Sequence, residues 1–491
     1  MTTESFMRRI QTSLGIGQGE GRLFCELCRL LRGPTLRLVR CRQLRLCLGS
    51  GSSRAGSVWL SRGFHVVSFS SNIAQRFGWF AVERALRLCI AFVIGVAVAR
   101  HLGPENFGLL SYAVSTVAVF SVLFTLGIDG LVVRDLSVSE SRAPVILGTA
   151  LCIRFFAGCV GAGLCCVYML VANSSKMGGR GIVMVQSLVM LFGWGEVLDY
   201  WFQSRPDPKI GVCARMGANL LGGGMRLLLI WADAPTMAFV LAGVVEVMVL
   251  AGAMWQGFKL ERVCVAPLRF DRAQAADLLK RGWSLALSAT LVMGILQGDR
   301  ILLGRLAGRE EMGWYAASAR FLDLLLMLPM LLGMSVQRVF AREAHAGPLA
   351  RSSSVWRVWV VANWVGLSAA VLMWAGSRWV VPWVFGPNYV AAAPILTVHA
   401  WIVIFVMQVS MRTRMLIAEG QHVLVLWLSL ATAAVQFTLL PMAIRLGGGV
   451  GAAYATLLAW FFGALVAPLL FRKTRWFVLA FPRAILFPFR A

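Results

Sequence analysis

The sequence predicts an all-α polytopic membrane protein of about 12 transmembrane helices, in two six-helix lobes related by a pseudo-two-fold axis along the membrane normal. Three observations predict this fold: the composition, a series of long apolar runs and an internal repeat. Of the 491 residues, 58% are hydrophobic and 14% are charged, and the mean hydropathy is +0.74. A soluble protein of this length could not bury so much apolar surface. Long apolar runs favour helices over a barrel.

Residues 1–70 differ in composition from the rest of the chain. They are rich in Arg, Gly and Ser and contain no run of 18 apolar residues. We expect a basic, disordered extension, part of which reflects a misassigned start, with translation beginning near residues 58–67. An Arg-rich presequence is the alternative, although a clear apolar core of a signal peptide is missing.

Candidate membrane spans follow one another from residue 77 onward. Each is long enough to cross about 30 Å of hydrocarbon as a helix. The twelve spans are 78–99, 106–128, 145–171, 181–203, 211–231, 235–257, 282–304, 314–336, 356–381, 390–411, 422–443 and 447–471.

The charge of the connections orients these spans. If the first span starts in the cytoplasm, the inner connections and the tail carry 22 Lys and Arg residues, and the outer ones carry 7. This positive-inside bias predicts that both termini are cytoplasmic. The predicted parts of the chain are an N-lobe (72–257), a cytoplasmic linker (258–281), a C-lobe (282–471) and a basic cytoplasmic tail (472–491).

A short motif between the first two spans occurs again 205 residues later. The pattern R-x-x-G-x-E-x-x-G is formed by Arg100, Gly103, Glu105 and Gly108, and again by Arg305, Gly308, Glu310 and Gly313. Chance is the alternative explanation, because the pattern is short. A duplication agrees with the long linker, which divides the helices into two sets of six. Since six is even, both halves enter the membrane in the same direction.

Basic residues inside the spans are the first candidates for a function. A charge at the centre of a membrane helix costs roughly 2.5–3.5 kcal/mol on insertion scales, so it usually faces water or a partner. Arg84 and Arg87 share one helix face and could bind a phosphate group. Snorkelling to the headgroups is the alternative for this pair. Further basic residues in spans are Arg154, Arg226, Arg300 and Arg320.

Acidic residues inside the spans are candidates for coupling or for salt bridges. Glu83, Asp299 and Asp323 are the main ones. Asp299 is the best candidate for coupling to a cation or proton, and a salt bridge between helices is the alternative. Adjacent helical residues point about 100° apart, so Asp299 and Arg300 need not pair. Arg320 and Asp323 are three residues apart and could neutralise one another.

Motifs of soluble enzymes are missing from the sequence. We find no Walker loop, no metal-ligand cluster and no nucleophile elbow. The sequence therefore predicts neither an enzyme nor a bound metal or cofactor. The net charge of +25 lies mainly before residue 63 and in short connections, so it does not indicate nucleic-acid binding.

Several stretches together resemble a known family. They are Trp79–Arg87, Ala99–Gly108 with Tyr112, Leu126–Asp129 with Arg134–Leu136, Asp199–Gln203, Asp299–Gly304 with Gly313, Tyr315 and Arg320, and Phe385–Gly386 with Tyr389. In order and spacing they are similar to polysaccharide transporters of the multidrug/oligosaccharidyl-lipid/polysaccharide exporter superfamily, in particular bacterial O-antigen flippases. The resemblance covers residues 72–471.

The resemblance implies two lobes around a central cavity that work by alternating access in the bacterial cytoplasmic (inner) membrane. It implies a polyprenyl-diphosphate-linked oligosaccharide as substrate, used for surface polysaccharide such as the O-antigen of lipopolysaccharide. Membrane lipids, a polysaccharide polymerase and glycosyltransferases are the expected partners. The basic residues that could line the cavity for the anionic headgroup are Arg84, Arg87, Arg154, Arg226 and Arg300.

Two other functions are weighed against this one. A cation-coupled multidrug exporter of the same superfamily would have a cavity dominated by carboxylates, whereas these spans are rich in Arg. A membrane glycosyltransferase or polysaccharide polymerase would need catalytic groups on large outer loops, and the outer connections here are short.

Overall fold

A computed structural model describes residues 71–139, 142–171, 178–205, 209–260, 268–333, 340 and 353–486. At residues 71–85 and at a few other helix positions it describes the backbone only. The expectations for residues 1–70 therefore fall outside the described part of the chain.

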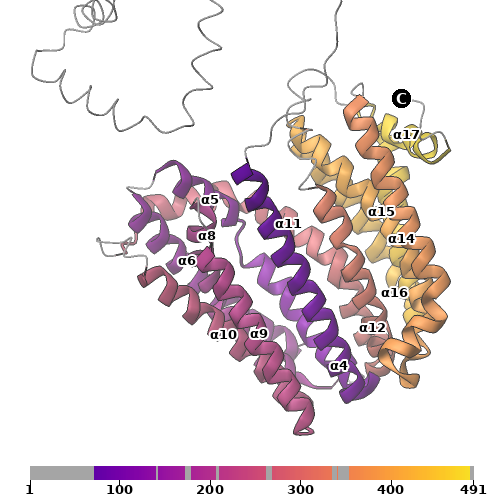
Figure 1. Ribbon diagram of the computed structural model, residues 1–491, viewed down its shortest axis with the longest axis horizontal. Helices are drawn as coiled ribbons and strands as arrows, with labels where there is room; N and C mark the ends of the chain where they lie inside the picture. The colour runs from indigo at the N-terminus through magenta and orange to yellow at the C-terminus, as the bar shows by residue number, and fades with distance from the viewer. Residues whose placement is uncertain are drawn as a thin grey trace, which may run out of the picture. The chain divides into compact units, whose positions relative to one another are not determined.

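The first half of the chain forms a group of helices on one side of Figure 1, with α4 at its inner edge. These helices are α4 (Ser71–Leu123), α5 (Asp129–Val138), α6 (Ala143–Val171), α7 (Arg180–Ser187), the 3-10 helix η3 (Leu188–Phe192), α8 (Gly195–Ser204), α9 (Lys209–Trp231) and α10 (Thr236–Leu260). The predicted span 181–203 is bent, because the stretches Arg180–Phe192 and Gly195–Ser204 meet at 41°.

The second half forms the other group in Figure 1, and α11 lies between the two groups. Its elements are α11 (Arg272–Ala307), α12 (Arg309–Leu325), α14 (Ser353–Phe385), η5 (Pro387–Tyr389), α15 (Ala392–Ala418), α16 (His422–Phe461), η6 (Phe462–Val466), η7 (Ala467–Leu470) and α17 (Arg475–Leu486).

Two long helices are broken by glycine. In α4 the backbone of Gly103 has a φ of 70°, and Pro104, which cannot donate a backbone hydrogen bond, follows it. In α16 the break lies at Gly447 and Gly448, and Gly448 has a φ of 53°. Each of these helices therefore contains one whole predicted span and most of the next.

The described residues contain 8 helices that are long and apolar enough to cross a membrane, or 9 if the bent pair counts as one span. The predicted all-α polytopic membrane fold is confirmed at this level. The number of candidate spans is below the predicted twelve partly because of the two broken helices. The stretches Leu86–Leu123 and Val423–Leu470 are each counted as one span, although two spans were predicted in each region. The helix α9 lies where span 211–231 was predicted but is not among the eight. Twelve spans stay a prediction.

The buried core shows where the two halves meet. The largest cluster combines residues of both halves, for example Phe107 and Tyr112 of α4 with Met312 and Tyr315 of α12. A second cluster belongs to the first half, apart from Leu278 at the start of α11. A third belongs to the second half alone. The halves therefore share a core near the break in α4, whereas at the end that carries α5 and α17 each half has its own (Figure 1).

Candidate functional site

The repeated motif lies where the two halves touch most closely. A Cβ atom added to Gly108 would overlap the carbonyl oxygen of Arg309, and one added to Gly313 would overlap the carbonyl oxygen of Pro104. Gly108 and Gly313 are 205 residues apart, and so are Pro104 and Arg309, so the two contacts occupy equivalent positions in the repeat. The contact therefore repeats itself when the halves are exchanged, as a two-fold axis requires. We call this end of the helices the motif end.

The two motif arginines each reach into the opposite half. Arg100 donates a hydrogen bond to the carbonyl oxygen of Trp383 in α14. Arg305 donates to the Tyr168 hydroxyl of α6 at 3.1 Å. These bonds add to the backbone contacts that close the motif end.

The remaining motif residues form the turns at this end and their contacts. Gly103 and Gly308 both have positive φ, which favours glycine. Glu105 pairs with Arg309 at 3.1 Å. Glu310 is exposed in the first turn of α12.

Charged residues of the second half lie along α11 and α12. Arg300 donates to both carboxylate oxygens of Asp323, at 3.0 and 3.2 Å. Its other terminal nitrogen donates to Gln297 at 3.1 Å. Asp323 thus pairs with Arg300 of the neighbouring helix, and it also lies within electrostatic range of Arg320, so local neutralisation of Arg320 by Asp323 stays a prediction.

Arg320 extends from α12 toward the first half. Its guanidinium carbon lies 5.9 Å from the ring centroid of Phe107 in α4. A Cβ atom at Gly95 of α4 would stand 3.6 Å from the same guanidinium. The glycine therefore leaves the space that the Arg320 side chain occupies.

Arg226 carries the corresponding positive charge of the first half. It forms an ion pair with Glu246 of α10 at 2.7 Å. It also lies within electrostatic range of Arg320, as do Arg300 and Asp323. We call Arg226, Arg300 and Arg320 the arginine group. The carboxylates beside the group are Glu246 and Asp323, and Asp299 also lies within electrostatic range of Arg300.

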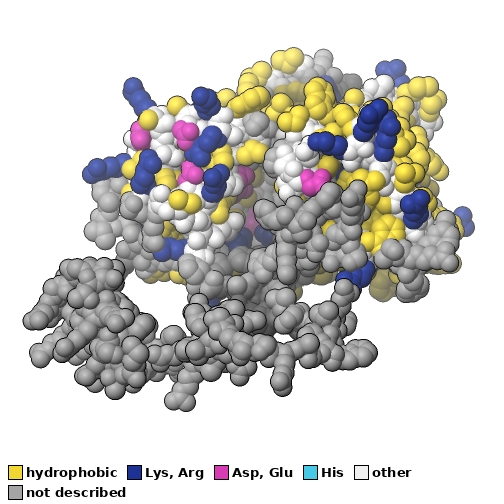
Figure 2. Space-filling model, turned by 90° about the horizontal axis from the view of Figure 1, so that it is seen from above, with side chains coloured by type: hydrophobic (Ala, Val, Ile, Leu, Met, Phe, Trp, Pro, Cys, Tyr) yellow, Lys and Arg dark blue, Asp and Glu magenta, His cyan; other side chains and the backbone are white. Residues whose placement is uncertain are grey.

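Figure 2 shows the molecule from above, which is the side of α5 and α17 in Figure 1. Two groups of described side chains stand apart in this view, and charged side chains lie in the recess between them. The recess faces the end where the halves have separate cores. Guanidinium groups bind carboxylate and phosphate anions through paired hydrogen bonds.

Arg154 belongs to a separate polar network inside the first half. It donates to Glu196 and, at 3.4 Å, to the carbonyl oxygen of Phe124. Nearby, Tyr200 donates to Asp129 at 2.7 Å. Arg154 is thus not brought together with the arginine group.

Asp299 faces the interior of the second half. It accepts hydrogen bonds from the Tyr315 hydroxyl at 2.5 Å, from the Thr456 hydroxyl at 3.4 Å and from the Arg300 backbone N–H at 2.7 Å. The ring of His399 lies 4.8 Å from that of Tyr315, and its Nδ1 is 2.9 Å from the Ser318 hydroxyl. Asp299 and Arg300 point in different directions, as the helical angle between neighbours requires.

The basic residues of the first span are described only in part. The side chains of Glu83 and Arg84 fall outside the described part of the chain. Arg87 is half-buried on α4. A phosphate-binding face shared by Arg84 and Arg87 therefore stays a prediction. No group of three His, Cys, Asp or Glu residues suited to a metal ion occurs within the described ranges.

Comparison with known proteins identifies the family and the fold of the chain. The family described as "Polysaccharide biosynthesis protein" matches residues 73–340. No curated protein sequence matches significantly. Several solved structures have the same fold at low sequence identity.

The lipid II flippase MurJ, in an inward closed conformation, is 13% identical with a TM-score of 0.64, over 83% of this chain and 91% of that one. An inward-facing multidrug resistance MATE family transporter of the MOP superfamily is 13% identical with a TM-score of 0.62, over 81% and 95%. The Vibrio cholerae MATE transporter VcmN is 14% identical with a TM-score of 0.57, over 84% and 97%. The chain therefore has the fold of MATE and MurJ transporters.

Proposed function

Because the chain belongs to the polysaccharide biosynthesis protein family, we propose that it carries a polyprenyl-diphosphate-linked oligosaccharide across the membrane. The fold is that of the solved MATE and MurJ transporters, and this likeness supports a transporter rather than an enzyme. The structural relative MurJ is a flippase of lipid II. A substrate with a lipid tail and an anionic headgroup agrees with both comparisons.

The observation that carries the proposal is the arginine group. Arg226 comes from the first half of the chain, and Arg300 and Arg320 come from the second, so both halves contribute positive charge to one region. A diphosphate accepts the bidentate hydrogen bonds that guanidinium groups donate. Movement of one negative charge toward the positive side is favoured by about 2.3 kcal/mol per 100 mV.

The proposed cycle is alternating access. The shared core at the motif end and the separate cores at the other end correspond to a state open toward α5 and α17. We assign this open face to the cytoplasm, in agreement with the positive charge of the connections. The headgroup would enter there, and the lipid tail would remain in the bilayer between two six-helix lobes, residues 72–257 and 282–471.

Asp299 is the residue that we assign to energy coupling. Its partners are two hydroxyl groups and a backbone N–H, and the side chain is 5% exposed. A buried carboxylate among hydroxyl groups can take up a proton or a small cation when the helices α11, α12 and α16 move. The remaining parts of the proposal are a bacterial inner-membrane location with both termini cytoplasmic, and a polymerase and glycosyltransferases as functional partners.

Transport is tested with the purified full-length protein in liposomes. A fluorescent polyprenyl-diphosphate oligosaccharide is followed by quenching on one face. We expect Arg320→Ala to lower the initial rate about tenfold, because a charge-assisted hydrogen bond contributes about 1.5–3 kcal/mol. The exposed Arg445 provides the control, and Arg445→Ala should leave the rate unchanged. Equal rates for Arg320→Ala and the wild type would contradict the role of the arginine group.

The structural likeness to multidrug transporters supports a second candidate, a cation-coupled drug exporter. The same liposomes distinguish the two functions. Cation-dependent efflux of a dye, with no movement of the lipid-linked sugar, would replace the proposal. In cells, a deletion strain should accumulate lipid-linked oligosaccharide on the cytoplasmic face.

A further inference from the structure

Residues 268–270 form a strap across one end of α6. The Arg269 backbone N–H donates to the Pro144 carbonyl oxygen at 3.2 Å. A Cβ atom at Gly148 would stand 2.6 Å from the Arg269 carbonyl oxygen, so the strap lies directly on the helix. The Asp271 backbone N–H donates to the Thr149 hydroxyl at 3.1 Å. The strap is therefore held in one place on α6.

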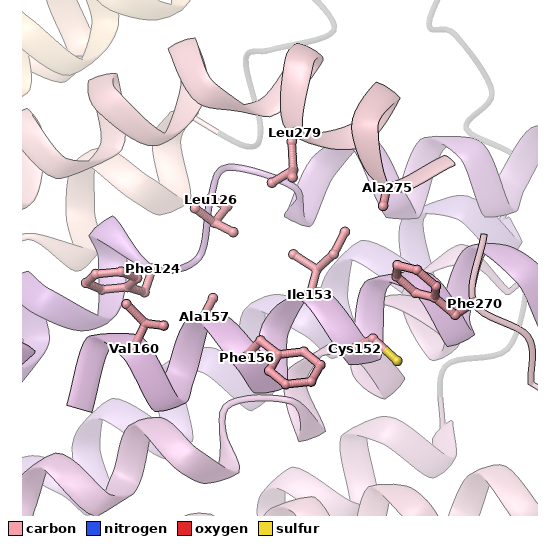
Figure 3. Close-up of a pocket in the computed structure, with 10 residues that line it drawn as sticks. All are labelled: Phe124, Leu126, Cys152, Ile153, Phe156, Ala157, Val160, Phe270, Ala275 and Leu279. Carbon is pink, nitrogen blue, oxygen red and sulfur yellow. The ribbon is translucent and has the colours of Figure 1, made fainter. Parts of the chain in front are cut away.

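An apolar groove lies on each side of α6 beneath the strap. The first has a volume of about 500 Å³ and runs between α6, the end of α4 and the start of α11. In Figure 3, Leu126 and Leu279 face Ile153 and Ala157 across this groove. The second has a volume of about 600 Å³ and runs between α6 and α10. Both volumes are within the usual range for pockets that bind small molecules.

The two grooves share a wall and a lid. Cys152 and Phe156 of α6 line both of them. From the strap, Phe270 lines the first groove and Leu268 lines the second. Arg269 stands between these two side chains and is exposed. The backbone of one basic residue is therefore held at the point where two apolar grooves begin.

The neighbouring charges leave this point positive. Arg272, in the first turn of α11, is exposed as well. Asp271 lies between the two arginines, and its carboxylate accepts a hydrogen bond from the Ala273 backbone N–H at 2.9 Å. The two guanidinium groups of Arg269 and Arg272 outnumber the single carboxylate of Asp271. The local charge is therefore positive, and an anionic partner is favoured at this end of the grooves.

We propose that the two grooves bind one anionic two-chain phospholipid, with an acyl chain in each groove and the phosphate at Arg269. The apolar walls favour hydrocarbon, the number of grooves matches two chains, and the cation between them matches the phosphate. A single isoprenoid chain would fill one groove and leave the other empty. The site lies on α6 and is separate from the arginine group, so it does not depend on the proposed transport function.

The charge requirement is tested by native mass spectrometry of the full-length protein. Phosphatidylglycerol and phosphatidylcholine with identical acyl chains are added in turn. We expect the wild type to prefer phosphatidylglycerol and Arg269→Gln to lower its binding about fivefold, the usual effect of one basic residue near anionic lipid. The exposed Arg472 supplies the control variant Arg472→Gln, which should bind as the wild type does. Equal binding of both lipids by the wild type would overturn the proposal.

The second groove is tested by filling it. Gly252 of α10 lines this groove, and a Cβ atom there meets nothing within 4 Å, so Gly252→Leu should fold normally. The wild type should bind phosphatidylglycerol more tightly than its one-chain lyso form, and Gly252→Leu should bind the two forms equally. Gly224 of α9 has the same open surroundings, and Gly224→Leu is the matched control.

Two further outcomes would overturn the inference. Equal binding of the two-chain and one-chain lipids by the wild type would show that one groove suffices. Displacement of phosphatidylglycerol by equimolar polyprenyl diphosphate, equally from the wild type and from the Arg472→Gln control, would assign the grooves to an isoprenoid tail instead.

Discussion

Charged side chains of the membrane helices pair with residues of neighbouring helices, as Arg300 does with Asp323 and Arg226 does with Glu246. A charge inside an apolar run is conspicuous because it is costly there, and this singled out Arg226, Arg300 and Asp323. Spacing along one helix then suggested that Asp323 pairs with Arg320. The hydrogen-bond partner Arg300 lies on another helix, and no spacing within one helix reveals a contact between two. The same reason explains why the contacts of His399 were missed.

At the residue scale, the hydrogen bond between Tyr315 and Asp299 should stabilise the second half. We expect Tyr315→Phe to lower the free energy of unfolding by about 1–3 kcal/mol, because a buried carboxylate loses a donor. Thermal unfolding in detergent measures the change. Tyr454 is 53% exposed, so Tyr454→Phe should have little effect. Equal stability of the two variants would show that water replaces the lost hydroxyl group.

Helices were predicted well where they are long and apolar, and less well where they are short or broken. The breaks in α4 and α16 coincide with Gly103-Pro104 and Gly447–Gly449, which the sequence marks clearly. The helix α17 lies in what was expected to be a basic tail. Its buried residues Phe477, Ala480 and Ala484 recur on one helical face, and this periodicity could have revealed the helix.

At the scale of the helix pair, the motif end should not tolerate a methyl group. We expect Gly108→Ala and Gly313→Ala each to destabilise the closed motif end by about 1–3 kcal/mol, because the new Cβ atom overlaps a backbone carbonyl group. Labelling of a cysteine introduced beside the contact, with and without the substitution, measures how often this end opens. A Cβ atom at Gly163 meets nothing within 4 Å, so Gly163→Ala is the control. Unchanged labelling in both motif variants would contradict the assignment of this contact as a gate.

For the whole molecule, composition and hydropathy were sufficient to predict a polytopic helical membrane protein. They could not predict which end is closed, because that is a choice between conformations of one fold. They also suggested a boundary at residue 282, which stays a prediction, and the start of α11 packs on the first half. A Cβ atom at Gly127 would stand 2.5 Å from backbone atoms of Gly282 and Ala286. Arg281 also pairs with Asp135 at 2.8 Å, and this bond raises the pKa of Arg281.

At the scale of the whole molecule, the ion pair between α11 and α5 should hold α11 to the first half throughout transport. We expect Asp135→Asn to cost at most about 1 kcal/mol of stability, since partly exposed ion pairs contribute little. Transport in liposomes should then fall less than in Arg320→Ala. A larger loss in Asp135→Asn than in Arg320→Ala would indicate that the pair controls the motion itself. Asp233, whose side chain is 95% exposed, provides the control variant Asp233→Asn.

The contact at Gly108 and Gly313 has a consequence for ancestry. A surface that is complementary to its own rotated copy is the surface by which two identical chains form a closed dimer. A gene encoding only six helices and one such motif would therefore have produced a homodimer, and its duplication and fusion would give the present protein. Fragments 1–263 and 264–491, produced together from separate genes, should consequently assemble and purify as one complex.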